Sequence, residues 1–238
     1  MALVGAFLFG VAGLLACYAI NKRRTVPLKY LRKNVPLRFL HIPKNAGTAV
    51  ENIALRNGVF WGWWDPDPRA GRAGSSCPCS AVHTPPGELT YNVYRDGPTF
   101  AIVRNPYNRI VSEYNYRCKC GGLELPSAAG LNRFIQTALH KSEEELKVEF
   151  DCHLLSQSAY VWDGDKRCNV TDIAKVETLN TDLAFIGCKY DIDFLKTPIP
   201  VMNRSARTVT SQCLDEESVR LVNKWYKEDF QNFNYLFR

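Results

Sequence analysis

The sequence predicts an α/β fold, in which a parallel sheet is flanked by helices and preceded by a single N-terminal transmembrane helix. Two short apolar strands are each followed at once by a loop and a helix-like segment. This alternation is typical of a parallel sheet covered on both faces. An uncharged apolar stretch occupies the N-terminus, and the 238 residues, 46% of them hydrophobic, suit one folded domain.

The apolar stretch Leu3–Ile20 contains no charged residue. It is just long enough to cross a bilayer as a helix. A cleaved signal peptide is the rival interpretation, and the letters LLAC at 14–17 resemble a bacterial lipoprotein cleavage box, but neither has the basic segment that normally precedes it. We expect a membrane anchor over residues 1–21, a basic stem over 22–36 and one globular domain over 37–238.

The net charge of +6 is concentrated near the N-terminal end. Seven Lys and Arg residues and no acid lie between positions 22 and 38, which leaves 23 basic and 24 acidic residues elsewhere. The globular domain is therefore close to neutral, and we expect no nucleic-acid partner.

The first strand is expected over Leu37–Ile42, an apolar run that Pro43 ends. A helix is expected from Gly47, where apolar residues recur at helical spacing. The second strand is expected over Thr99–Val103, followed by a helix from Pro106 through Tyr116. Further helices are expected over Gly130–Leu146 and Asp215–Tyr226, and short strands over Ala174–Glu177 and Ala184–Ile186.

Residues 61–98 are rich in Trp, Pro, Gly and Cys and show no sustained periodicity. Long irregular segments inside compact domains are usually functional or disordered, and the aromatic content argues against disorder. Two interpretations stay open: a lid of packed tryptophans and a platform on which sugars stack.

Eight of the nine cysteines lie outside the apolar stretch, which suits an oxidising compartment. They would allow up to four disulfides, whose connectivity the sequence does not give. An alternative is a zinc site built from Cys77, Cys79, Cys118 and Cys120, although their C-x-C spacing is tighter than usual.

The first motif is PKNAGT at Pro43–Thr48, between the first strand and its helix. A parallel sheet presents backbone N–H groups to anions at this position. Gly47 would let the backbone approach closely, Lys44 would supply charge and Thr48 a hydroxyl donor. The Lys precedes the Gly, so this is not a Walker A loop and kinase activity is disfavoured. The candidate phosphate ligands are Lys44, Asn45, Ala46, Gly47 and Thr48.

The second motif is RNPYNRIVSEY at 104–114, directly after the second strand. Arg104 can bind a phosphate through two nitrogens, and Ser112, about two helical turns later, can face the same anion. Arg109 could brace the site, although a surface ion pair is the commoner arrangement.

Together these motifs resemble sulfotransferases: P-K-x-x-G-T resembles their 5′-phosphosulfate loop, and R-[DN]-P-x-x-R-x-x-S-x-[YF] their 3′-phosphate element. The HLLSQ segment at 153–157, the N-x-S triplet at Asn203 and the closing aromatic segment 226–235 resemble the Golgi carbohydrate sulfotransferases. The resemblance implies a P-loop NTPase-like fold and 3′-phosphoadenosine-5′-phosphosulfate as sulfuryl donor. It also implies that Arg104 and Ser112 hold the 3′-phosphate.

The resemblance further implies a carbohydrate acceptor, sulfated on a hydroxyl or amine, and a single-pass protein facing the Golgi lumen. The basic flank predicts the opposite orientation by the positive-inside rule, and this conflict stays open. In a lumenal domain, Asn169 would be a candidate for N-glycosylation; Asn203 also fits the triplet but overlaps a possible site loop. The alternatives are a nucleotide-dependent kinase and a non-catalytic glycan-binding module on the same fold.

For the chemistry, we expect Lys44 to stabilise the leaving phosphate. His83 is the expected general base because histidine titrates near neutrality and the resemblance places a His before the second strand. His153 and Glu51 are alternatives for this role. No required metal is expected, because nothing in the sequence resembles a Walker B acid or a metal-binding cluster.

Overall fold

The computed structural model describes residues 35–65, 67, 77–120, 125–162, 168–199 and 209–238. Its sheet has three parallel strands in the order β1-β2-β3: β1 is Arg38–Leu40, β2 is Thr99–Val103 and β3 is Asp172–Lys175. Every residue of β2 is buried, as expected of the central strand of a covered sheet. The α/β fold expected from the sequence is confirmed.

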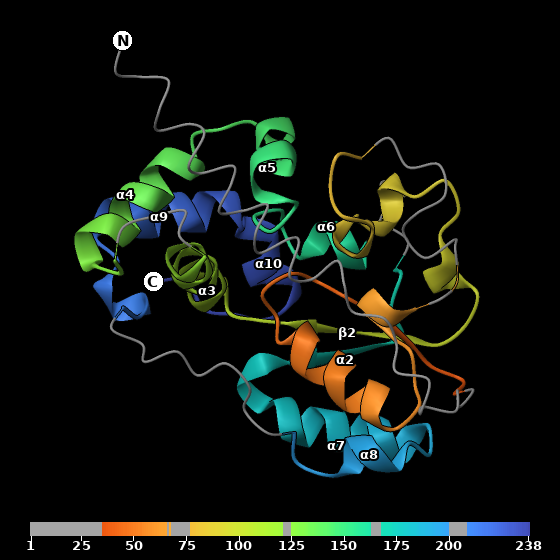
Figure 1. The fold of residues 1–238 in the computed structure, drawn as a ribbon. Helices are drawn as coiled ribbons and strands as arrows, with labels where there is room; N and C mark the ends of the chain where they lie inside the picture. The colour runs from red at the N-terminus through yellow and green to blue at the C-terminus, as the bar shows by residue number, and fades with distance from the viewer. Residues whose placement is uncertain (1–34, 66, 68–76, 121–124, 163–167, 200–208) are drawn as a thin grey trace.

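Side chains of β2 alternate between two apolar cores. Phe100 and Ile102 face a core shared with α2 (Gly47–Arg56), α7 (Leu179–Lys189) and α8 (Asp193–Lys196), which lie together below β2 in Figure 1. Ala101 and Val103 face a second core that includes α6 (Ser158–Val161). Helices therefore cover both faces of the sheet.

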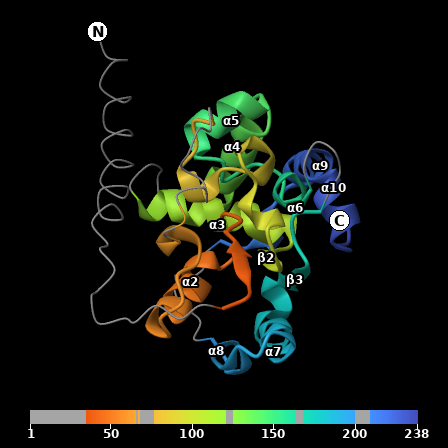
Figure 2. The ribbon, with the colours of Figure 1, turned by 90° about the vertical axis from the view of Figure 1, so that its right-hand side faces the viewer.

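A third core lies beside the sheet and contains no strand residue. It is formed mainly by five helices: α3 (Pro106–Lys119), α4 (Ala128–Ala138), α5 (Glu143–Phe150), α9 (Glu216–Trp225) and α10 (Lys227–Asn232). Figure 2 shows α4 and α5 at the end of the molecule opposite α7 and α8. Short 3₁₀ turns complete the described structure, at Gly62–Trp64, Ala81–His83, Pro86–Glu88, Val93–Arg95, Val176–Thr178 and Ser211–Cys213.

Two secondary-structure predictions were wrong. The single helix expected over Gly130–Leu146 is two helices, because Ser142 caps α5 in a reciprocal capping box with Glu145. The strand expected over Ala184–Ile186 lies inside α7. Short apolar runs do not distinguish a strand from a buried helix by periodicity alone.

The tryptophans around position 61 are mainly structural. Trp61 is buried against Phe39 and Phe100 and donates its indole N–H to the Leu37 carbonyl at 2.9 Å. Trp64 is also buried. For these two side chains the packed arrangement is confirmed, and neither offers a face to a sugar.

The expected anchor, residues 22–34 of the stem, and the Asn203 triplet lie outside the described residues. Within the described residues, no helix combines the length and apolarity needed to cross a bilayer.

The zinc site expected as an alternative was wrong, because Cys79 forms a disulfide with Cys152 and therefore offers no thiolate. The other six described cysteines carry thiols. Glycosylation of Asn169 stays a prediction; in the structure this residue is 2% exposed, and its amide nitrogen donates to the Tyr160 carbonyl at 3.0 Å.

Candidate active site

The loop from β1 to α2 has the geometry of an anion cradle. Lys44 and Ala46 have φ angles of 70° and 63°, a left-handed conformation that costs energy in residues other than glycine and is concentrated at functional sites. Ala46 is the N-cap of α2 and gives it no side-chain cap, and the first turn contains no acid. The first N–H groups and the positive end of the helix dipole are thus left for an anion.

A buried glutamine joins this loop to the end of β2. The Gln157 side chain accepts hydrogen bonds at 2.8 Å from the Asn45 amide and from the Arg104 backbone N–H. It donates to the Arg104 carbonyl at 2.9 Å. The Asn45 amide also donates to the Ile102 carbonyl at 2.8 Å. The side chain of Asn45 therefore holds the loop in place.

These contacts bring the two predicted anion-binding elements together. The Arg104 guanidinium donates to the Lys44 carbonyl at 3.3 Å, so the side chain that follows β2 lies directly on the loop that follows β1. The carboxyl ends of parallel strands meet at one edge of a sheet, which is where α/β proteins bind ligands.

Arg109 braces the same region from α3. It is 2% exposed and donates to the carbonyls of Pro43 at 3.1 Å, Leu155 at 2.6 Å and His153 at 3.0 Å. The bracing role is confirmed, and the surface ion pair is excluded. One guanidinium thus fixes the start of the loop relative to the segment that carries His153 and Gln157.

Gly47 has a packing role that the sequence did not indicate. A Cβ atom at this position would lie 2.7–3.0 Å from three atoms of the His41 ring, closer than side chains normally approach. His41 is buried, and its Nδ1 lies 2.5 Å from a carboxylate oxygen of Glu51. The missing side chain of Gly47 therefore makes room for an imidazole.

The ammonium of Lys44 lies between an acid and an aromatic ring. Its nitrogen is 3.7 Å from a carboxylate oxygen of Glu113 and 3.8 Å from the centre of the Tyr116 ring. Burial lowers the pKa of Lys44, and the Glu113 carboxylate opposes that shift. Glu113 itself is fully buried. Burial favours its neutral form, but His153, Lys44 and Arg117 outweigh burial and hold its pKa well below the usual range.

Three histidines lie next to this pair, each hydrogen-bonded to a different carboxylate. The ring centre of His83 is 5.4 Å from that of His41 and 4.7 Å from that of His153. His83 contacts Asp151 at 2.8 Å, and His153 contacts Glu113 at 2.8 Å. We call His41, His83 and His153 the histidine cluster. Glu113 links it to Lys44.

Burial lowers the pKa of His83 to about 4, and its hydrogen bond to Asp151 reduces this shift. Burial would raise the pKa of Asp151, but the bonds from His83 and from Ser80 prevail and lower it to about 2. At neutral pH the pair therefore consists of a neutral imidazole and a carboxylate. A neutral imidazole can accept a proton.

The remaining predictions, on Thr48, Ser112 and metal independence, gain less support from the structure. Thr48 is exposed in the first turn of α2. Ser112 is half-buried on α3, and its hydroxyl makes no hydrogen bond within the described part of the chain. His83, Asp151 and His153 present ligand atoms within 4.8 Å of one another, close enough to consider for a metal ion. The expected independence of metal stays a prediction.

Two site residues were missed or undervalued from the sequence. Gln157 appeared only within a family-like segment, and nothing indicated that it joins two loops. Glu113 was one unmarked position of the second motif. What distinguishes both residues is a buried polar side chain, and this burial is visible only in the folded structure.

The profile of the sulfotransferase family matches residues 31–236. The chain belongs to the sulfotransferase family. The match includes both predicted anion-binding elements and the histidine cluster, so they lie in the family domain of an enzyme that transfers sulfate. No curated protein and no solved structure matches this sulfotransferase.

Proposed function

We propose that this sulfotransferase moves a sulfuryl group from 3′-phosphoadenosine-5′-phosphosulfate to a hydroxyl or amine of a carbohydrate. The observation that carries the proposal is the hydrogen bond from the Arg104 guanidinium to the Lys44 carbonyl. It brings together the two sequence elements that would bind opposite ends of one doubly anionic nucleotide.

The described residues fit such a donor. The uncapped N-terminus of α2 offers N–H groups to the 5′-phosphosulfate, and Lys44 adds positive charge there. Arg104, whose backbone is fixed by Gln157, would hold the 3′-phosphate, with Ser112 as the second ligand. The donor itself supplies an activated sulfuryl group and a phosphate leaving group.

Lys44 would stabilise the negative charge that develops on the leaving phosphate oxygen. This task requires an ammonium that stays protonated although it is mostly buried. The Glu113 carboxylate, 3.7 Å away, favours the charged form of Lys44 against burial. Glu113 also bonds His153, so one acid positions both a cation for the leaving group and a candidate base.

The acceptor must lose a proton as its oxygen or nitrogen bonds to sulfur. His83 is the proposed base: it is neutral at physiological pH, and Asp151 holds its ring through Nδ1. His153 stays an alternative because its ring packs on that of His83. Glu51 fits the role less well, since it is 4% exposed and bonds both His41 and the Trp63 backbone N–H.

The resemblance to Golgi carbohydrate sulfotransferases supports a sugar acceptor, a lumenal site and the N-terminal membrane anchor. The kinase alternative lacks the Gly-Lys order of a Walker A loop. The glycan-binding alternative would not need both anion-binding elements.

Donor binding and turnover test the proposal. Adenosine 3′,5′-bisphosphate should raise the melting temperature of the purified protein, whereas ATP with magnesium should not. Radiolabelled sulfate should pass from the donor to desulfated glycans. The Lys44→Ala variant should lose at least about a hundredfold in turnover, and Lys224→Ala, which removes an exposed lysine, should lose nothing. Protection by ATP alone, or full turnover in Lys44→Ala, would refute the assignment.

A further inference from the structure

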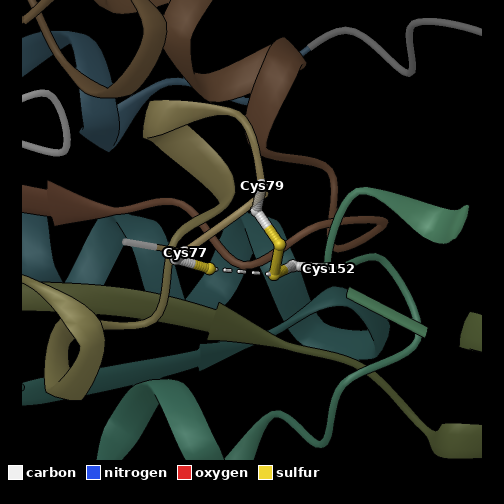
Figure 3. Close-up of side chains that lie close together, drawn as sticks. All are labelled: Cys77, Cys79 and Cys152. Atoms are coloured by element: carbon white, nitrogen blue, oxygen red, sulfur yellow. Dashed lines mark hydrogen bonds between the residues drawn. A yellow bond between two sulfur atoms is a disulfide. The ribbon is translucent and has the colours of Figure 1, made fainter. Parts of the chain in front are cut away.

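Three cysteines meet beside the histidine cluster. Cys79 and Cys152 form a disulfide, and the thiol sulfur of Cys77 lies 3.8 Å from the sulfur of Cys152 (Figure 3). Cys77 and Cys79 are separated only by Pro78, so both approach Cys152 from the same short segment. The Cys152 sulfur therefore has two neighbouring sulfurs and is bonded to that of Cys79.

The surroundings favour reaction within the protein. Cys152 is 0% exposed, so an external thiol has no direct access to its sulfur. Cys77 is only partly buried and is already in contact with it. Thiol–disulfide exchange requires a thiolate that can reach a disulfide sulfur, and Cys77 meets the requirement of proximity.

We propose that Cys77 and Cys79 exchange as the disulfide partner of Cys152. The Cys77 thiolate forms a bond to the Cys152 sulfur, and the electron pair of the Cys79–Cys152 bond leaves on the Cys79 sulfur. Cys79 then takes up a proton in place of the one that Cys77 gave to solvent. The step conserves one disulfide and one thiol and needs no outside oxidant.

The exchange would act on the segment that positions His83. Ser80 follows Cys79, and its backbone N–H and hydroxyl both bond the Asp151 carboxylate. The same carboxylate holds His83. Moving the covalent link from position 79 to position 77 would release Ser80 from its fixed distance to Asp151. The effect on catalysis rests on the proposed function, but the exchange itself does not.

Burial is the largest effect on the Cys77 thiol and raises its pKa above the ordinary value, and the Glu88 carboxylate acts in the same direction. A backbone hydrogen bond with Cys79, a hydrogen bond with Thr84 and the Lys147 ammonium oppose this shift without reversing it. Because the thiolate is the attacking species, the exchange rate should rise about tenfold per pH unit below that pKa.

Differential alkylation of the full-length protein tests the proposal without any substitution. The native protein is held at pH 7 or pH 8.5 without reductant, labelled with N-ethylmaleimide, then unfolded, reduced and labelled with the deuterated reagent. A tryptic peptide spanning 73–95 contains both cysteines, and fragment ions locate each label. We expect a light label on Cys77 in part of the population and on Cys79 in the rest, reached faster at pH 8.5. Light label confined to Cys77 at both pH values contradicts the proposal.

Two variants sharpen the result. Cys79→Ser, incubated with oxidised glutathione, should form a Cys77–Cys152 disulfide. Cys77→Ser should keep Cys79 protected from the light label, which shows that labelling of Cys79 in the parent requires Cys77. A folded Cys79→Ser protein in which Cys77 and Cys152 both stay reactive thiols would overturn the inference, as would light label on Cys79 in Cys77→Ser.

Discussion

Replacing Gly47 by alanine tests whether this glycine serves the packing of His41 or the approach of an anion. The φ angle of Gly47 is not positive, so its backbone conformation accepts alanine. In the middle of a helix this change gains about 0.5–1 kcal/mol, and the gain at the first residue of α2 should be no larger. Against this gain stands the new Cβ, which would lie 2.7 Å from the nearest ring atom of His41. Glu51, at 2.5 Å from that ring, prevents easy movement.

Overpacking of a well-packed core typically costs about 1–3 kcal/mol. Each kcal/mol lowers the melting temperature of a chain of this size by roughly 2–4 °C. Gly47→Ala should therefore melt several degrees below the parent in a thermal scan. Gly97→Ala is the matched control, because nothing lies within 4 Å of the Cβ built there, and it should melt at the parent temperature or slightly higher.

A double-mutant cycle with His41→Ala isolates the clash. If His41 is the obstacle, Gly47→Ala should cost little or nothing once the ring is removed. Equal destabilisation in both backgrounds would refute the packing argument. Binding of adenosine 3′,5′-bisphosphate, measured on the same proteins, reports the second role: if the backbone must approach the anion, affinity stays low in the double variant although stability recovers.

Three further predictions follow from buried polar groups and from the disulfide. Gln157→Leu leaves the Arg104 N–H and carbonyl without their Gln157 partners, which should lower the free energy of unfolding in urea by about 2–5 kcal/mol and weaken bisphosphate binding. The control Gln136→Leu removes only an exposed contact of α4 with Asp215 and should change neither the stability nor the binding. His83 has a folded pKa of about 4, below its unfolded value of 6.5, so the folded state binds fewer protons. Stability should thus be full above pH 6.5 and fall by about 3 kcal/mol as the pH drops to 4, and this slope should be lost in His83→Asn. The Cys79–Cys152 bond closes a loop with a sequence separation of 73, so the double variant Cys77→Ser/Cys79→Ser should lose about 4 kcal/mol of unfolding free energy. Cys79→Ser alone should lose clearly less, because Cys77 replaces Cys79 as the partner of Cys152. Equal losses in the two variants would argue against exchange.

The parts of the fold that local chemistry determines could be predicted from the sequence. The second strand was predicted at Thr99–Val103, where it lies, because the four apolar residues Phe100–Val103 precede a charged loop and a proline-initiated helix. The α2 and α9 helices were also predicted close to their bounds. The break between α4 and α5 was missed, although the S-x-x-E spacing of Ser142 and Glu145 is a sequence signature of a helix N-terminus.

The candidate site likewise combines features that the sequence predicts with contacts that only the structure reveals. Lys44 and Arg104 were predicted to act together from motif order, and the structure places the Arg104 side chain on the Lys44 carbonyl. The partners of His83 could not be predicted, because Asp151 lies 68 positions away and its approach depends on a disulfide whose pairing the sequence does not specify. Contacts between distant segments follow from packing, which residue patterns describe only for one element at a time.

The hydrogen bonds of Gln157 reach further than the loops that it joins. Its backbone N–H and side-chain amide both donate to Asp229, which lies on α10 and also accepts from Ser158. The cradle near the beginning of the domain is thus supported from the opposite end of the sequence. During synthesis on the ribosome, the strands and α2 can form early, but a nucleotide-ready cradle has to wait until α10 emerges. We expect a nascent chain that ends before Asp229 to fold its sheet and still be unable to retain the donor.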